Sequence, residues 1–277
     1  MSYTPVIPAS GYAGWKLLNR TMEKQKAAFV ASADVKRDED YFRSKIGTIT
    51  TAEDLVADRR LLKVALGAFG LDSDINNKFF VRKVLEGSTT DTKALANKLA
   101  DKTYLKLATA FGFGDSDTPR TQLSGFADEI LQKYETRQFE AAVGDSDETY
   151  RFAMSAQREL ADLAAASSSN NTKWYSVIGS KSLSTVMQTA LGLPSSVGSL
   201  DVDQQLVIYT QKAKSVLGSS DFATFSDSAV MDKTIRLYLV RSQMAANTTA
   251  TSGNVALQLL QGGSTGISTA SLLSKLV

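Results

Sequence analysis

Residues 50–70, with the sequence TTAEDLVADRRLLKVALGAFG, carry the clearest helix pattern in the chain. Thr50 and Glu53 have the spacing of a capping box, in which both side chains accept hydrogen bonds from free backbone N–H groups at the start of a helix. Four apolar residues then recur at helical spacing, namely Leu55, Leu62, Leu66 and Phe69. Gly70 follows them, and glycine readily adopts the left-handed conformation that ends many helices. The stretch predicts one amphipathic helix that ends at Gly70.

Similar patterns extend along most of the chain, which has only four prolines and long stretches rich in Ala, Leu, Lys, Glu and Gln. No segment shows a convincing alternation of apolar and polar residues, and the best strand candidate, LVIY at 206–209, lies within a helical context. Further helices are predicted at 12–33, 74–86, 91–100, 102–111, 120–142, 147–166, 181–191, 202–217 and 227–245. We therefore predict an all-α protein.

The tripeptide Asp-Ser-Asp occurs three times, at 72–74, 115–117 and 145–147. Each copy follows a glycine, or a Gly-Leu pair, and precedes the apolar face of the next predicted helix. We expect Gly70, Gly114 and Gly144 to end helices in the left-handed conformation. The Asp and Ser side chains would then cap the helix that follows, where a negative charge also suits the helix dipole.

A calcium loop is the alternative interpretation of these aspartates. Such a loop needs a glycine at its sixth position and a carboxylate at its twelfth. Counted from Asp72, these positions hold Asn77 and Lys83, and the same count from Asp145 fails as well. The sequence therefore predicts helix boundaries and no metal site at the Asp-Ser-Asp repeats.

The chain of 277 residues contains neither cysteine nor histidine. This excludes disulfides, thiolate and imidazole metal sites, and Ser-His or Cys-His nucleophile pairs. A net charge of +2 without blocks of like charge gives no indication of nucleic-acid binding. The N-terminus lacks the features of a cleaved secretion signal, and no run of about 18 apolar residues predicts a membrane span. We expect no enzyme, no catalytic residues, no cofactor, no metal, no nucleic-acid partner and no membrane insertion.

Two short motifs carry alternatives. AFGFGD at 110–115 has the glycines of a phosphate-binding loop, but it follows a predicted helix and lacks the expected Lys and Ser/Thr, so we favour a helix cap with Phe111 and Phe113 packed. DRRLL at 58–62 is either an acid–base cluster or, as we favour, a solvated helix face or a salt-bridged Asp58.

Four pairs of short words recur in the same order in the two halves of the chain. They are YFRSKIG (41–47) with WYSVIG (174–179), AFGL (68–71) with ALGL (190–193), VLEGS (84–88) with VLGS (216–219), and ADKTYLKL (100–107) with MDKTIRLYL (231–239). This order favours an ancient duplication over chance agreement of short words. We predict a tandem pair of related helical bundles, divided into a first repeat with its leading helix (1–119), a connecting helix (120–146), a second repeat (147–245) and a C-terminal tail (246–277).

Residues 242–274 carry no charge and are rich in Ser, Thr, Ala, Gly and Asn. This polar, uncharged tail is either flexible or a pair of short amphipathic segments that order against a partner. Its recurring leucines favour partner-dependent order. The apolar stripe of the first predicted helix is expected mainly in the core, but it is also a candidate assembly surface. The candidate partner-contact residues are Trp15, Leu18, Met22, Phe29, Leu257, Leu260, Leu272, Leu273 and Leu276.

Several longer words resemble a bacterial family known as domain of unknown function 1217. They are PASGYAGWKLL (8–18), YFRSKIG (41–47), AEDLVADRRLLKVALGAFGLDSDI (52–75), FVRKVLEGS (80–88), LADKTYLKLATAFGFG (99–114) and YETRQFEAAVG (134–144). The resemblance covers roughly residues 8–245 and is denser in the first half. It brings no catalytic residues, and it implies an association with flagellar gene clusters in alphaproteobacteria.

Flagellar axial proteins are similar to this chain in lacking cysteine, in being rich in Ser, Thr, Ala and Asn, and in leaving the cell without a cleaved signal. The resemblance thus implies a non-enzymatic structural or assembly component of the bacterial flagellum. Its partners would be flagellar protein subunits, with self-association as a further expectation. The alternative is a cytoplasmic helical adaptor or export chaperone, although a chaperone would more typically be acidic.

Overall fold

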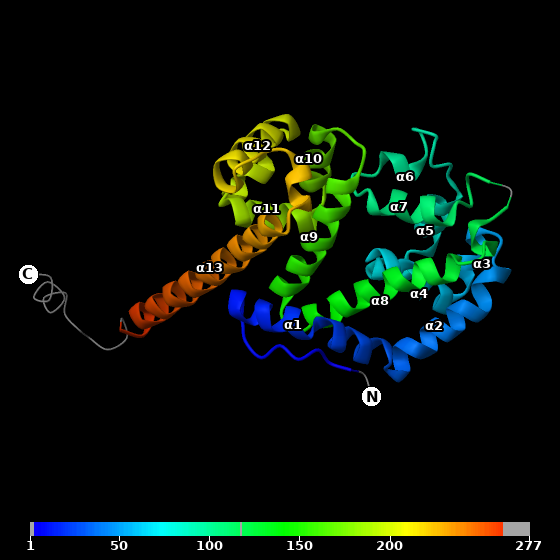
Figure 1. The fold of residues 1–277 in the computed structure, drawn as a ribbon, viewed down its shortest axis with the longest axis horizontal. Coiled ribbons are helices and arrows are strands. Elements are labelled where there is room, and N and C mark those ends of the chain that lie inside the picture. The colour runs from blue at the N-terminus through cyan, green and yellow to red at the C-terminus, as the bar shows by residue number, and fades with distance from the viewer. Residues whose placement is uncertain (1–2, 117, 263–277) are drawn as a thin grey trace, which may run out of the picture.

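The computed structural model describes the backbone of residues 3–116 and 118–262, with side chains up to residue 247. In these residues the chain forms only helices and their connections, so the predicted all-α fold is confirmed (Figure 1). The α-helices are α1 (Gly11–Val30), α2 (Ala33–Lys45), α3 (Ala52–Ala57), α4 (Arg59–Phe69), α5 (Lys78–Glu86), α6 (Leu95–Lys98), α7 (Thr103–Phe111), α8 (Phe126–Gly144), α9 (Glu148–Ala165), α10 (Asn170–Gly179), α11 (Lys181–Leu191), α12 (Val202–Leu217) and α13 (Ser228–Gly262). The short 3₁₀-helices are η1 (Ile46–Thr48), η2 (Asp72–Asn76), η3 (Arg120–Gln122), η4 (Ser195–Ser199) and η5 (Phe222–Ser226).

The stretch 50–70 forms two helices, α3 and α4, where the sequence predicts one. The start of α3 is also displaced by one residue. Thr51 is its N-cap, and Thr51 Oγ1 accepts a hydrogen bond from the backbone N–H of Asp54 at 3.1 Å. The Asp54 carboxylate in turn accepts a hydrogen bond from the Thr51 hydroxyl at 2.7 Å. The predicted capping pair of Thr50 and Glu53 is therefore wrong by one position.

Asp58 separates the two helices because its backbone is extended. Its carboxylate accepts hydrogen bonds from the N–H groups of Arg60 and Leu61, at 2.9 and 3.1 Å, and so caps α4. The hydroxyl of Tyr41 donates to the same carboxylate at 2.6 Å. The guanidinium of Arg60 lies over the Tyr41 ring, 3.8 Å from its centroid. Arg59 and Arg60 are exposed, as predicted for a solvated helix face. The predicted salt bridge of Asp58 is corrected to an N-cap, because the free N–H groups that begin α4 compete for this carboxylate.

Other helix boundaries also differ from the sequence predictions. Neither α2 nor α10 was predicted, and α6 covers only part of the predicted helix 91–100. In α2 only Val35 and Phe42 are buried, so the helix has no continuous apolar stripe by which to recognise it. By contrast, α13 continues to Gly262, well past the predicted end at residue 245.

The three predicted helix-ending glycines behave differently. Gly70 ends α4 in the left-handed conformation with φ 73°, as predicted. The prediction is wrong for the other two, because Gly112 (φ 65°) ends α7 and Gly144 is the last residue of α8 without a positive φ. Gly114 is needed for close packing instead, since a Cβ there would lie 2.5 Å from the backbone of Gly87. A Cβ at Gly144 would similarly lie 2.4 Å from a side chain of α9.

Most of the described aspartates that follow these glycines accept hydrogen bonds from within the chain. Asp147 caps α9 by accepting from the N–H of Thr149 at 2.9 Å. Asp74 accepts from the hydroxyl of Tyr104 at 2.6 Å. Asp115 instead holds the loop after α5, accepting from the backbone N–H of Thr89 at 2.7 Å and from its hydroxyl at 2.6 Å. Residue 117 lies outside the described residues.

The helices form two groups that meet along α8 and α9 (Figure 1). One group contains α3–α7, and the other contains α10–α12 with the first part of α13. The helices α1 and α2 run along one edge of the molecule, with α1 reaching α13 and α2 packing on α4 and α8. Most buried apolar residues from α1 to α13 form one core, which includes both tryptophans, Trp15 and Trp174, and a small second cluster joins α5, α6 and α7.

The two groups share an order of packing. The helix α4 packs against α8 as α11 packs against α13, and α3 contacts α5 as α10 contacts α12. Both α4 and α11 end at a left-handed glycine, Gly70 and Gly192, followed by a 3₁₀-helix. A duplication would produce the same order of packing in both groups. The tandem relation and its domain boundaries remain a prediction. The fourth word pair joins α7 to α13, which pack on unlike neighbours: α7 on α4, α5 and α6, and α13 on α1, α9, α11 and α12.

Candidate interaction sites

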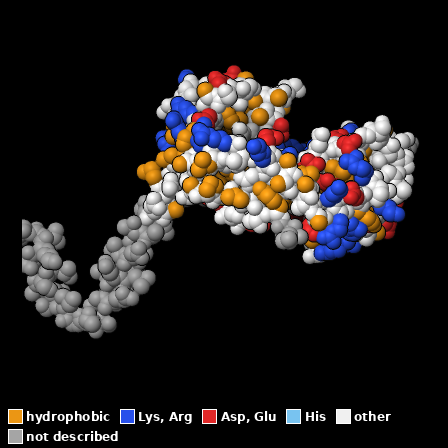
Figure 2. Space-filling model, turned by 60° about the horizontal axis from the view of Figure 1, so that its bottom comes forward, with side chains coloured by type: hydrophobic (Ala, Val, Ile, Leu, Met, Phe, Trp, Pro, Cys, Tyr) orange, Lys and Arg blue, Asp and Glu red, His pale blue; other side chains and the backbone are white. Residues whose placement is uncertain are grey.

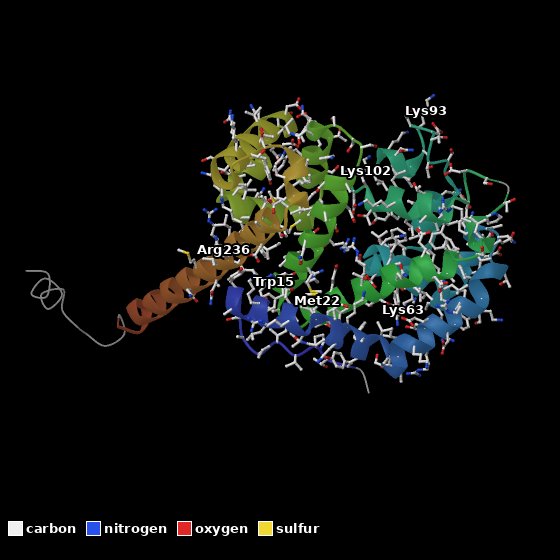
Figure 3. The ribbon with its side chains drawn as sticks, viewed as in Figure 1. Trp15, Met22, Lys63, Lys93, Lys102 and Arg236 are labelled. Carbon is white, nitrogen blue, oxygen red and sulfur yellow. The ribbon has the colours of Figure 1, made fainter. Side chains whose placement is uncertain are left out.

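Three of the predicted partner-contact residues on α1 lie in the protein's own core. Trp15, Leu18 and Phe29 are 1%, 0% and 8% exposed. The Trp15 ring packs against Tyr150 of α9, with ring centroids 6.0 Å apart, and Phe29 packs edge-on against Phe139 of α8. The prediction that these three residues contact a partner is therefore corrected, because the apolar stripe of α1 packs against other parts of the same chain. Figure 3 labels Trp15 on this helix.

Met22 is partly buried against the same core, so it offers a partner only a fraction of its surface. The predicted contact residues of the tail cannot be placed in the same way. Leu257 and Leu260 fall within α13, beyond the last described side chain. Leu272, Leu273 and Leu276 lie outside the described residues altogether.

Hydrogen bonds explain why α1 belongs to the body. The Tyr12 hydroxyl and Lys16 Nζ both donate to Asp232 of α13, at 2.8 and 2.9 Å. The extended segment before α1 is held by Gln25, which accepts from the N–H of Val6 at 2.7 Å and donates to its carbonyl oxygen at 3.1 Å. These hydrogen bonds fix α1 to α13 and fix the preceding segment to α1.

The helix α13 has a packed part and a projecting part. Met231, Ile235, Tyr238 and Leu239 are buried where α13 packs on α9 and α11. Beyond them the helix leaves the body and extends into the surroundings (Figure 1). Hydrophobic side chains gather on the surface beside the point where the helix emerges, as Figure 2 shows.

Four charged side chains meet between α8 and α9, where the two groups of helices join. Arg158 donates two hydrogen bonds to Glu140, from Nε at 2.9 Å and from Nη2 at 3.0 Å. Arg137 donates to Glu159 at 3.1 Å, and the Ser155 hydroxyl donates to the same oxygen at 3.1 Å. We call Arg137, Glu140, Arg158 and Glu159 the charged quartet.

Burial makes the pairing within the quartet necessary. Glu140 is 4% exposed, and a carboxylate at such a depth is costly unless donors surround it. Burial, with the nearby Arg158 adding to it, lowers the pKa of Arg137. Burial also opposes the charge of Arg158, but the hydrogen bonds to Glu140 together with the negative charges of Glu140, Glu159 and Asp162 outweigh it, so the pKa of Arg158 is raised. The quartet contains two positive and two negative side chains, so its net charge is zero. Its ion pairs link α8 to α9.

Two cavities flank the quartet. One, of about 730 Å³, reaches from Arg137 and Glu159 to the first turns of α7 and α11. The other, of about 630 Å³, lies on the side of α4 and α7 and includes Arg158. Sequence reasoning missed the quartet, and the only local signal was the spacing of Arg137 and Glu140, which places them on one face of a helix.

Metal-binding clusters and membrane-spanning helices are both absent from the part of the chain that the structure describes. There, no group of three or more Asp or Glu residues is arranged to hold a metal ion. None of the described helices combines the length and apolarity needed to cross a bilayer. In AFGFGD, Gly112 ends α7 and the rings of Phe111 and Phe113 pack 5.7 Å apart, so the predicted helix cap is confirmed.

The fold and these sites define an all-α protein whose distinctive features are a projecting terminal helix and a charged junction between two helix groups. The family model described as "Protein of unknown function (DUF1217)" matches residues 68–231, which is more than half of the chain. The chain belongs to this family, as its sequence words indicated.

The fold is similar to that of a protein from Agrobacterium tumefaciens whose X-ray crystal structure was solved as a structural genomics target. The TM-score is 0.70 and the sequence identity is 24%, over 87% of this chain and 99% of the other. At this identity the likeness concerns the fold alone. No curated protein matches the chain at a significant level.

Proposed function

We propose that this protein is a non-enzymatic structural or assembly component of the bacterial flagellum that packs against partner subunits through its terminal helix. The observation that carries the proposal is the projection of α13 from the body. The projecting part lies in the uncharged stretch 242–274, so it has no ion pairs between successive turns to support it. Its Thr, Ser, Asn and Gly residues are also poor helix formers.

A helix of this composition gains most of its stability from packing against another surface. The segment includes VALQLLQ (255–261), and each leucine covered by a partner would contribute about 1.5–3 kcal/mol. The resemblance described above supports flagellar subunits as that partner, because it implies an association with flagellar gene clusters. Absence of histidine and cysteine supports a structural role over catalysis.

The test is to locate the protein in cells. Purified flagella, culture medium and cytoplasm from motile cells are probed with an antibody against this chain. We expect the full-length protein in purified flagella or in the medium. Detection only in the cytoplasm of cells with intact flagella would contradict export and would favour the helical adaptor or export chaperone.

A further inference from the structure

A second group of charged residues lies where the elbow formed by α1 and α2 meets α8. A cavity of about 580 Å³ opens at this seam. Its charged lining residues are Glu23 and Lys26 from α1, Lys36, Glu39, Asp40 and Arg43 from α2, and Glu135 from α8. The seam matters for the fold because it joins the elbow to the long helix at the junction of the two helix groups.

One oxygen in this seam has no donor. Glu39 Oε1 is buried and accepts no hydrogen bond from the described residues. Two nearby bases are engaged elsewhere, since Lys26 Nζ donates to Thr136 Oγ1 at 2.8 Å and Arg43 pairs with Asp128. A buried carboxylate oxygen without a donor is unfavourable when charged, and a bound proton removes that charge.

Neighbouring negative charges also favour the protonated form of Glu39. Glu135 faces Glu39 from α8, and Asp38 and Asp40 lie on either side of it in α2. The cavity is also lined by one further acid, Glu23 of α1, and one further base, Lys36 of α2. On the other side of α2, Lys63 of α4 forms an ion pair with Asp38 at 2.6 Å and not with Glu39. The seam therefore places Glu39 and Glu135 together, and of its three lining cations only the Lys36 side chain makes no hydrogen bond or ion pair among the described residues.

We propose that Glu39 holds a proton in this seam, and that loss of the proton weakens the packing of the α1–α2 elbow against α8. The elbow is then a pH-sensitive contact built into the fold. Arg43 opposes the effect, but its guanidinium is held by Asp128 and neutralises Glu39 only in part.

The direction of the pH dependence follows from the carboxyl group itself. Burial, and next the charge of Glu135, raise the pKa of Glu39 from 4.5 to about 7. A carboxyl whose pKa is higher in the folded than in the unfolded protein stabilises the folded form below pH 4.5. That contribution is lost progressively as the pH rises from there through about 7. The elbow should therefore pack more tightly against α8 when Glu39 is protonated.

The experiment compares wild-type protein with Glu39→Gln, whose neutral amide imitates the protonated acid. Urea unfolding and amide exchange of α1 and α2, corrected for intrinsic exchange rates, are measured from pH 5.5 to 8.5. We expect the wild-type folding constant to fall up to about tenfold more than that of the variant across this range, allowing for partial exposure of the group. Exchange protection of α1 and α2 should fall with pH only in the wild type.

Glu129→Gln is the matched control, because it removes a carboxylate of α8 that pairs with Lys133 outside the cavity. It should keep the wild-type pH profile. Carbon-13 NMR of the Glu39 carboxyl in the wild type gives a reading that requires no variant to fold. A midpoint near 7 supports the proposal, and a lower midpoint in Glu135→Gln would identify the charge of Glu135 as one of its causes. A midpoint below 5.5, or identical pH profiles for wild type and Glu39→Gln, would overturn it.

Discussion

Arg158 of α9 donates two hydrogen bonds to Glu140 of α8, from Nε at 2.9 Å and from Nη2 at 3.0 Å. The planar guanidinium matches the two carboxylate oxygens, which fixes both the distance and the orientation of the two side chains. These hydrogen bonds join α8 to α9 where the two helix groups meet.

Removing Arg158 should therefore weaken the junction. Arg158→Ala leaves Glu140 buried without its two donors, and we expect a loss of about 2–4 kcal/mol in the free energy of unfolding, measured by urea denaturation. Arg151→Ala on the same helix is the control, because its pair with Glu148 is exposed and should contribute less than about 1 kcal/mol. Equal losses for the two variants would show that the junction does not depend on this pair.

Replacing Gly70 should strain the end of α4. Any side chain there must adopt the left-handed conformation, so Gly70→Val should cost about 1–3 kcal/mol in thermal or urea unfolding. Gly47→Ala is the control, since no atom lies within 4 Å of a Cβ at that position and its φ is not positive. A neutral Gly70→Val would mean that α4 does not need this terminator.

The cap at Asp58 can be tested with two substitutions. Asp58→Ala removes the acceptor for two backbone N–H groups and for the Tyr41 hydroxyl, and should destabilise the protein by about 1–2 kcal/mol. Asp58→Asn keeps an acceptor oxygen and should cost less. If both substitutions shift the melting curve equally, the charge of Asp58 and not its capping bond is the important property.

Metal removal should leave the fold unchanged. Four of the Asp-Ser-Asp carboxylates, those of Asp72, Asp74, Asp115 and Asp147, accept hydrogen bonds from within the chain. Adding EDTA should therefore leave the melting temperature where it is. A fall of several degrees, reversed by adding back calcium, would identify a metal at these turns.

Deleting residues 246–277 should separate folding from assembly. Among the described residues the buried core ends at Leu239, so the truncated protein should keep its helical circular dichroism and its cooperative unfolding. Incorporation into flagella should be lost, as measured by the amount of protein in purified filaments relative to the cytoplasm. Normal incorporation of the truncated chain would place the assembly surface elsewhere.

Several features could be predicted from the sequence because they depend on neighbours along the chain. The all-α fold follows from apolar residues at helical spacing. The ends of α4 at Gly70 and of α7 within AFGFGD follow from what glycine alone does at a helix terminus. The burial of Trp15 follows from the apolar stripe that carries it.

Other features required the tertiary structure, because their partners are distant in sequence. Tyr41 and Asp58 meet only when α2 packs on α4, and Gly114 is needed only because Gly87 lies against it. The charged quartet likewise joins residues of two helices, and nothing within α8 alone shows that Glu140 will be buried. Local hydrogen bonding and apolar spacing determined where most helices form. Long-range packing decided which distant hydroxyl Asp58 binds, which charges are buried, and that the stripe of α1 contacts its own core.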